Sequence, residues 1–306
     1  AGQEIALDVP PTATIGGVVA DALAGPRRLR YGSPRDLLIG ITIVRADGIV
    51  ARSGGKVVKN VAGYDLGKLF AGSAGSLGLI TEVTFRLHPL PAARAWVTAA
   101  FARAADAGRA VATAANSPLT ASAVELHQPA PGDPVSVGVL LEGSADGTTA
   151  RAQRLASLLS SAAISQAAPS WWGGVPDPGP GPDGIAGTLL RVTFWVSALG
   201  QVLDAIDGAA RESGMRPVVH GAAGAGVLSV TLDADAPPAG VARLVAAIRE
   251  AIPAGRGGAV VVAAPGRVRS VIGDVAIPGA GLMRAVKDQF DPGGRMAPGR
   301  LFEGLS

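Results

Sequence analysis

The sequence predicts an α+β protein: a glycine-rich region of strands and turns, followed by a larger region of antiparallel sheet covered by helices. Two observations carry this prediction. Apolar and polar residues alternate in short runs near the N-terminus, as half-buried strands do. From residue 95 onward, valine- and leucine-rich runs alternate with alanine-rich stretches of helical periodicity. There the order strand, helix, strand, strand, helix occurs twice, which is typical of split antiparallel sheets with helices packed on them.

The first region is expected to contain a hairpin and a glycine-rich turn. The run LLIGITIV (37–44) and the run IVARSGG (49–55) flank Asp47-Gly48, a dipeptide typical of hairpin turns. A short helical stretch, YDLGKLF (64–70), precedes the turn GSAGSLG (72–78), and LITEVTFRL (79–87) follows as a strand. Glycine leaves no Cβ in the way, so this turn could bring bare backbone to a ligand. A tight turn that binds nothing remains the alternative.

The second region contains the two repeated units. The first unit runs from WVTAAF through the helix ARAADAGRAVATAA and the strands ASAVEL and VSVGVLLEG to the helix TTARAQRLASLLSSA. The second unit has TLLRVTFWV, QVLDAIDGAARESG, PVVH, GVLSVTLDA and AGVARLVAAIREA in the same order. A strand, GAVVVAAP (258–265), a helix near LMRAVKDQF (282–290) and the tail FDPGGRMAPGRLF (290–302) complete the chain.

Three blocks of sequence resemble a known family. They are 14–48, 54–89 and 290–302, and they resemble the vanillyl-alcohol-oxidase-type (PCMH-type) FAD-linked oxidoreductases, in particular the FAD-binding subunits of glycolate oxidases. The resemblance implies that 1–94 is the second half of the FAD-binding domain, 95–264 a cap or substrate domain, and 265–306 a return to the FAD domain. The family's first FAD subdomain, which carries the pyrophosphate loop, is expected to be missing from this chain.

The resemblance also implies a set of residues that would bind FAD non-covalently. Near the diphosphate and the ring it places Thr14, Gly16, Gly17, Ala20 and Gly25, followed by Tyr31 and Gly32. At the adenosine end it places Gly75, Ser76, Gly78 and Ile80. Family members often have Asn at the position of Ala297, so a polar contact from the tail is not expected.

The implied function is the oxidation of a small 2-hydroxy acid such as glycolate, with a hydride passing to the flavin. A second flavin subunit and an iron–sulfur subunit are the implied partners, because the chain has no cysteine to ligate a cluster. A cytoplasmic location is expected, with peripheral attachment to the inner membrane through partner subunits as a variant. The alternatives are a non-catalytic assembly subunit and a self-sufficient FAD-linked alcohol oxidase.

Composition excludes several other classes. The absence of cysteine rules out disulfides, thiolate-bound zinc and a cysteinyl flavin link, and no apolar run is long enough to span a bilayer. The net charge is +3, but charged residues make up only 17% and aromatic residues 4% of the chain, so nucleic-acid binding is not expected. Arg27, Arg28 and Arg30 are expected either to face an anionic ligand or to form a solvated basic loop.

Three histidines are available for acid–base or metal chemistry. His88 and His127 are expected to be structural, as a strand-end residue and an exposed turn residue. His220 is the candidate catalytic base, with a structural role as the alternative. No metal site is expected. The pattern G-x-G-x-x-G at Gly179, Gly181 and Gly184 is interrupted by prolines and is interpreted as a linker, with Trp171 and Trp172 anchoring it.

Overall fold

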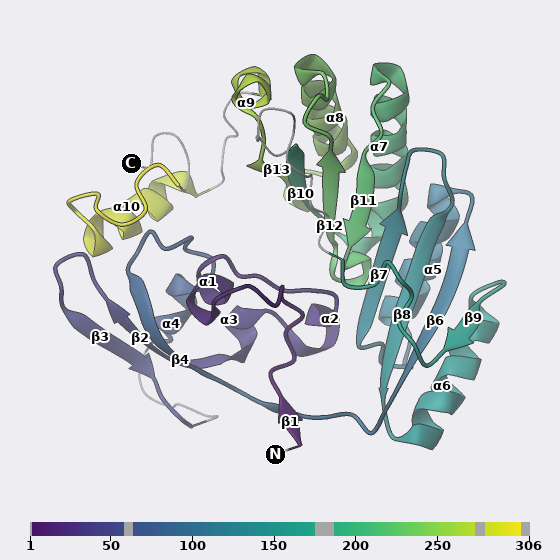
Figure 1. The fold of residues 1–306 in the computed structure, drawn as a ribbon, viewed down its shortest axis with the longest axis horizontal. Coiled ribbons are helices and arrows are strands. Elements are labelled where there is room, and N and C mark those ends of the chain that lie inside the picture. The colour runs from purple at the N-terminus through teal and green to yellow at the C-terminus, as the bar shows by residue number, and fades with distance from the viewer. Residues whose placement is uncertain (1, 58–63, 175–186, 273–278, 301–306) are drawn as a thin grey trace. The chain divides into compact units, whose positions relative to one another are not determined.

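The computed structural model describes residues 2–57, 64–174, 187–272 and 279–300, and the chain divides into two units (Figure 1). The first unit contains Ala1–Gly25, Tyr31–Leu90 and Asp274–Ser306. The second contains Pro26–Arg30 and Pro91–Gly273. Compared with the ranges expected from the sequence, residues 26–30, 91–94 and 265–272 lie with the second unit. The assignment of the units to cofactor and substrate stays a prediction.

The first unit is built on a three-stranded antiparallel sheet in the order β3-β2-β4. Its strands are β2 (Leu38–Val44), β3 (Val50–Gly54) and β4 (Leu79–Phe85). The β2–β3 hairpin turns at the Asp47-Gly48 dipeptide, as the sequence predicts, and pairs Val44 with Val50. Around the sheet lie α1 (Ile15–Ala20), α3 (Pro34–Leu37), α4 (Gly67–Phe70), α10 (Ala280–Phe290) and the two-stranded sheet of β1 (Gln3–Glu4) and β5 (His88–Pro89).

Helix α10 is joined to this unit by a buried lysine. The ammonium of Lys287 donates to the carbonyls of Ser76 and Met296, each at 2.8 Å, and pairs with the carboxylate of Asp291. Asp291 also accepts from the amides of Arg295 at 2.9 Å and Met296 at 2.7 Å. Burial opposes ionisation of Asp291, but these hydrogen bonds and the Lys287 charge outweigh it and hold its pKa below the usual value.

The second unit contains an eight-stranded antiparallel sheet in the order β13-β10-β12-β11-β7-β8-β6-β9. The strands are β6 (Ala93–Phe101), β7 (Ala123–Gln128), β8 (Val135–Gly143), β9 (Ala163–Ser165), β10 (Thr188–Phe194), β11 (Val218–Gly221), β12 (Val227–Leu232) and β13 (Gly257–Ala263). The helices are α2 (Arg28–Tyr31, which ends in the first unit), α5 (Ala104–Asn116), α6 (Ala145–Leu158), α7 (Leu199–Ser213), α8 (Pro238–Ala251) and α9 (Gly266–Ile272), with 3₁₀ turns η1 (Val196–Ala198) and η2 (Ala223–Ala225).

The sheet confirms the two predicted β-α-β-β-α units and shows how they join. Each half has the same strand arrangement, and the halves meet where β7 of the first pairs with β11 of the second. Every second strand residue, such as Val124, Val137 and Val219, packs with α5–α8 in one core cluster. The helices thus cover one face of the sheet (Figure 1), and the intervening side chains belong to the opposite face.

Replacement of Lys287 by Met is expected to destabilise the chain by about 3–5 kcal/mol, because Asp291 would remain buried without its cation. Urea unfolding followed by circular dichroism measures this loss. Gln289→Met, at an exposed position of the same helix, is the matched control and should change stability by less than about 0.5 kcal/mol. Equal losses for the two variants would contradict a structural role for the Lys287 ammonium.

Candidate functional site

The glycine-rich segment forms a tight turn fastened to helix α1. The amide of Ser76 donates to the carbonyl of Ser73 at 3.0 Å, and the two residues between them, Ala74 and Gly75, have φ of 52° and 76°. Positive φ at both central positions is the property of a type I′ turn. The amides of Gly72 and Ala74 donate to the carbonyls of Val19 at 3.0 Å and Ala20 at 2.8 Å, at the end of α1.

Two glycines of the predicted FAD site present backbone to open space. A Cβ added at Gly75 would meet no atom within 4 Å, and at Gly16 it would meet only the carbonyl oxygen of Ile80, at 3.7 Å. Gly16 lies in the first turn of α1, where Thr14 accepts the Gly17 amide at 3.2 Å. The structure therefore brings the predicted residues of 14–20 and 75–80 together, with bare backbone at each end of α1.

The other predicted glycines are explained by packing. An added Cβ would lie 2.4 Å from the Asp8 side chain at Gly25 and 2.6 Å from that of Asp36 at Gly32. At Gly17 it would lie 3.0 Å from the Thr14 hydroxyl, and at Gly78 it would lie 3.1 Å from the Val44 carbonyl. At these four positions the lack of a Cβ lets neighbouring side chains or backbone pack closely against the glycine. Tyr31 likewise packs edge-on against His88, with ring centroids 4.8 Å apart.

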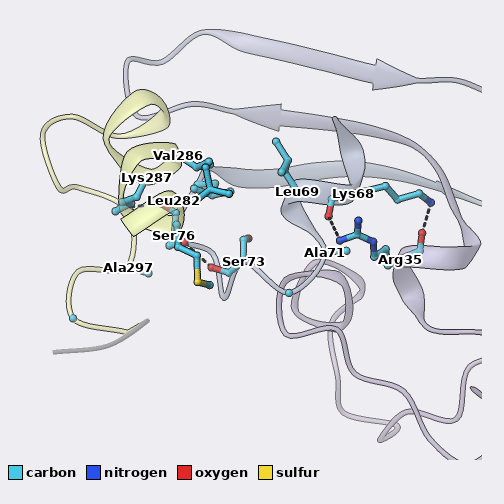
Figure 2. A pocket seen from close by; sticks show the side chains of 14 residues that line it. Arg35, Lys68, Leu69, Ala71, Ser73, Ser76, Leu282, Val286, Lys287 and Ala297 are labelled. Atoms are coloured by element: carbon cyan, nitrogen blue, oxygen red, sulfur yellow. Dashed lines mark hydrogen bonds between the residues drawn. The ribbon is translucent and has the colours of Figure 1, made fainter. Parts of the chain in front are cut away.

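A cavity of about 260 Å³ lies against the same turn, on the side of helix α10 (Figure 2). Ser73, Ser76 and Leu77 line it from the turn, and Leu282 and Val286 line it from α10. Most of its lining is apolar. Of the residues predicted to bind FAD, Ser76 alone lines this cavity, so the bare backbone of Gly16 and Gly75 and the cavity are neighbouring but separate features.

Two cationic side chains, Arg35 and Lys68, line one end of the cavity, and each donates a hydrogen bond to the backbone carbonyl of the other residue. Arg35 donates to the carbonyl of Lys68 at 3.3 Å, while the Lys68 ammonium donates to the carbonyls of Arg35 and, at 2.7 Å, Leu38 (Figure 2). Asp65 lies 3.7 Å from the Lys68 ammonium. The sequence analysis did not identify this pair. The sequence does hold a clue to it, because Lys68 lies in a short helical stretch directly before the glycine-rich turn.

The face of the second unit's sheet opposite its helices carries a polar cluster around His220. Its Nε2 lies 2.7 Å from Oε1 of Glu125, an ion-pair distance without hydrogen-bond geometry, and both side chains are more than nine-tenths buried. The other carboxylate oxygen accepts the Gly173 amide at 2.9 Å. His127 is the cross-strand partner of His220, with ring centroids 5.6 Å apart, and it stacks on Trp171 at 5.8 Å.

The prediction that His127 is an exposed turn residue was therefore wrong. It lies within β7, partly buried, because the strand continues to Gln128. Burial and the nearby charge of His220 lower the pKa of His127 below its ordinary value.

Trp171 and Trp172 anchor the end of their segment on the same face. They lie over Gly138, where an added Cβ would come within 2.8 Å of the Trp171 ring. Gly179, Gly181 and Gly184 lie outside the described residues.

Two of the basic-loop arginines make internal contacts, one in an ion pair and one in a hydrogen bond. Arg27 lies 3.8 Å from the buried carboxylate of Glu142, which also binds Arg94 at 3.0 Å. Arg30 donates to the hydroxyl of Ser122 at 3.2 Å.

Among the described residues, no three His, Cys, Asp or Glu side chains converge on a point where a metal ion could bind. None of the helices described is long and apolar enough to cross a bilayer.

Comparison with known proteins shows what parts of the chain are similar to. No family model matches the chain. It is 50% identical over 78 residues to the glycolate oxidase subunit GlcD of Bacillus subtilis and 48% identical over 96 residues to GlcE of Escherichia coli. These matches cover 26% and 30% of this chain. A mitochondrial D-lactate dehydrogenase [cytochrome] of Arabidopsis thaliana is 38% identical over 120 residues, 39% of this chain.

The fold agrees over nearly the whole chain. An alkyldihydroxyacetonephosphate synthase structure covers 97% of this chain with a TM-score of 0.67 and 16% sequence identity. The structure of a VAO-type flavoprotein of Myceliophthora thermophila covers 96% of this chain with a TM-score of 0.61 and 16% sequence identity. The chain therefore has the same fold as these two proteins. The sequence matches span only 17%, 27% and 21% of the three relatives' own lengths, and the fold matches span 60% and 62% of the two solved chains.

The lowered pKa of His127 predicts a pH-dependent stability. The unfolded chain takes up a proton on His127 near pH 6.5 and the folded chain only at lower pH, so this residue's contribution to stability is full above that pH. It is lost as the pH falls from about 7 through the lower, folded-state pKa. Urea unfolding between pH 8 and 5 should show a shallower acid loss for His127→Gln than for the parent chain. An acid loss in His127→Gln as steep as that of the parent chain would contradict this assignment.

Proposed function

We propose that this chain is an FAD-dependent oxidoreductase subunit that acts on a small 2-hydroxy acid such as glycolate. The observation that carries the proposal is the junction of α1 with the Ser73–Ser76 turn, where Gly16 and Gly75 leave backbone bare in a chain whose segments match glycolate oxidase subunits. Bare, preorganised backbone of this kind suits the close approach of a dinucleotide.

The residues present fit part of such a cofactor. The positive-φ turn at Ala74-Gly75 and the first turn of α1, capped by Thr14, would hold the dinucleotide by main-chain contacts. Gly17, Gly25, Gly32 and Gly78 would keep that backbone in position, and Tyr31 would support it through His88. The cavity of about 260 Å³ is smaller than typical ligand pockets of about 300–1,000 Å³, so it would take only one ring-sized portion.

In this proposal the backbone would bind the cofactor, and side chains would take part in proton transfer and substrate binding. A bound flavin supplies the hydride acceptor. The backbone of α1 and the turn would bind and orient it non-covalently, and His220 stays the candidate from sequence for the residue that would receive the hydroxyl proton. A substrate carboxylate would need a cation, and Arg191 lies in the strand register next to Ser229, the cross-strand partner of His220.

The proposed setting is a complex of several subunits. A second flavin subunit and an iron–sulfur subunit would complete it, since electrons must leave the flavin and this chain has no cysteine for a cluster. The matches to both GlcD and GlcE support a multi-subunit assembly. We place the complex in the cytoplasm, where contact with the inner membrane would come through partner subunits.

A bulky residue at Gly75 is expected to abolish FAD binding and leave the fold intact. In Gly75→Leu the side chain would project from the turn into the open space proposed for the dinucleotide. The matched control is Gly48→Leu, because Gly48 has φ of 83° and is equally open but lies in the β2–β3 hairpin. Both variants should lose about 1–2 kcal/mol from the positive φ. Flavin absorbance per complex should fall only in Gly75→Leu, and equal flavin content in both would contradict the proposed site.

One observation favours a second candidate, a non-catalytic assembly subunit. The cavity beside the turn is too small to enclose a whole dinucleotide, so the same surface could instead contact another subunit. In that case Gly75→Leu would weaken co-purification of the partners and leave the flavin content and turnover per assembled complex unchanged. A self-sufficient alcohol oxidase would be recognised by peroxide production from this chain without partners.

A further inference from the structure

The cavity beside the glycine-rich turn is bordered by large apolar side chains that are open to solvent. Leu69 of α4 and Leu282 and Met283 of α10 line it, and they are 40%, 72% and 41% exposed. Exposed apolar side chains that gather around a cavity are typical of a binding site, because covering them with a ligand removes apolar surface from water. All residues that line the cavity belong to the first unit, so it is a feature of that unit alone.

Three cationic side chains line the cavity, and two of them are lysines whose protons are already used. The ammonium of Lys287 gives its three protons to two carbonyls and a carboxylate. The ammonium of Lys68 donates to the carbonyls of Arg35 and Leu38 and has the Asp65 carboxylate beside it at 3.7 Å. An ammonium has three donors, so neither lysine has one to offer a ligand.

The third cation, Arg35, has donors to spare. A guanidinium carries five N–H groups. Among the described residues, its only hydrogen bond runs from Nη1 to the Lys68 carbonyl at 3.3 Å, and no carboxylate pairs with it. That bond holds the side chain at the end of the cavity (Figure 2). The paired N–H groups of a guanidinium match the two oxygens of a carboxylate, so this end of the cavity suits one carboxylate.

The volume of the cavity suits a small hydrocarbon body. An apolar protein cavity of about 150 Å³ holds one benzene molecule, so a cavity of about 260 Å³ has room for roughly ten carbon atoms. Met283 adds an adaptable wall, because the thioether side chain of methionine packs well against irregular apolar shapes. A ligand of this size fits the cavity whole, whereas a dinucleotide would fit only in part.

We propose that this cavity is a binding site for a small apolar monocarboxylate. The carboxylate pairs with the Arg35 guanidinium, and the hydrocarbon lies along Leu69, Leu282 and Met283. One cation with free donors accounts for one negative charge, and the apolar walls account for the hydrocarbon. The ligand also contacts the Ser73–Ser76 turn, whose residues line the cavity. The inference does not rest on the proposed function.

Methyl NMR of the full chain tests the site, because the three methionines lie in different places. Met283 lines the cavity, whereas Met215 is buried in the core of the second unit. With ¹³C-labelled methionine methyls, octanoate should shift the Met283 signal saturably and leave the Met215 signal unchanged, and Met283→Leu assigns the first signal. Acetate, which has the charge without the chain, should shift neither. No shift of Met283, or equal shifts of both signals, would overturn the proposal.

Octanol tests the role of the charge, because it has the same eight carbons as octanoate and no carboxylate. It should bind at least about tenfold more weakly, since it loses the charged hydrogen bonds to Arg35. Arg35→Gln should bind octanoate as weakly as the parent binds octanol, and Arg35→Lys should recover part of the affinity. Arg52→Gln, which changes an exposed arginine of β3, is the matched control and should bind octanoate as the parent does. Equal affinities of the parent for both probes, or equal losses in the two Gln variants, would overturn the proposal.

The complete complex tests whether the cavity and the proposed flavin surface are separate sites. Octanoate should bind with the same affinity to the complex with and without FAD. Displacement of octanoate by FAD, or loss of octanoate binding when the partners assemble, would overturn this inference and leave the proposed function standing. A complex that contains this chain, carries no flavin on it and still binds octanoate would overturn the proposed function and support the inference.

Discussion

The buried ammonium of Lys287 is the constraint on which the proposed cofactor surface depends. An ammonium in the protein interior requires acceptors for its protons, and here they are the Ser76 carbonyl, the Met296 carbonyl and Asp291. Ser76 closes the glycine turn, and the other two acceptors follow helix α10. One charge therefore fixes the turn against a segment more than 200 positions later in the chain. Backbone contacts to α1 fix it on the other side, so its shape exists before any ligand binds.

The two units use different physical means to build their sites. The first presents main chain, since Gly16 and Gly75 offer no side chain at all. The second carries polar side chains on the face of its sheet opposite helices α5–α8. Its duplicated halves meet at β7 and β11, and that meeting produces the pair of histidines. Gly108 and Gly200 let the corresponding helices α5 and α7 approach closely, with only 3.1 Å between an added Cβ at Gly108 and the amide of Gly200.

Local patterns in the sequence predicted the elements well. The Asp47-Gly48 turn, the strand after the glycine turn and both β-α-β-β-α units are present because each depends on residues close in sequence. The same patterns could not distinguish glycines required by packing from glycines that leave backbone open to a ligand. Gly25 and Gly32 are required by Asp8 and Asp36, and only tertiary packing shows that Gly75 is open. Nor could they find the role of Lys287, which looks like any surface lysine of an amphipathic helix.

The pairing of His127 with His220 also escaped prediction for a physical reason. Strand register between distant segments is set by the whole sheet, and neither strand contains a signal for its partner. A weak clue existed in the duplication itself. The runs VELHQ and PVVHG occupy the same place in the two units, so an alignment of the halves would have set the histidines in equivalent positions.

The central claim is that the bare backbone of α1 and the Ser73–Ser76 turn binds the flavin nucleotide. A structure of the complete complex with FAD bound tests it most directly. The account predicts nucleotide atoms in van der Waals contact with the Cα atoms of Gly16 and Gly75, with the turn unchanged. Flavin held wholly by other chains, with Gly75 facing solvent or a protein partner, would contradict it.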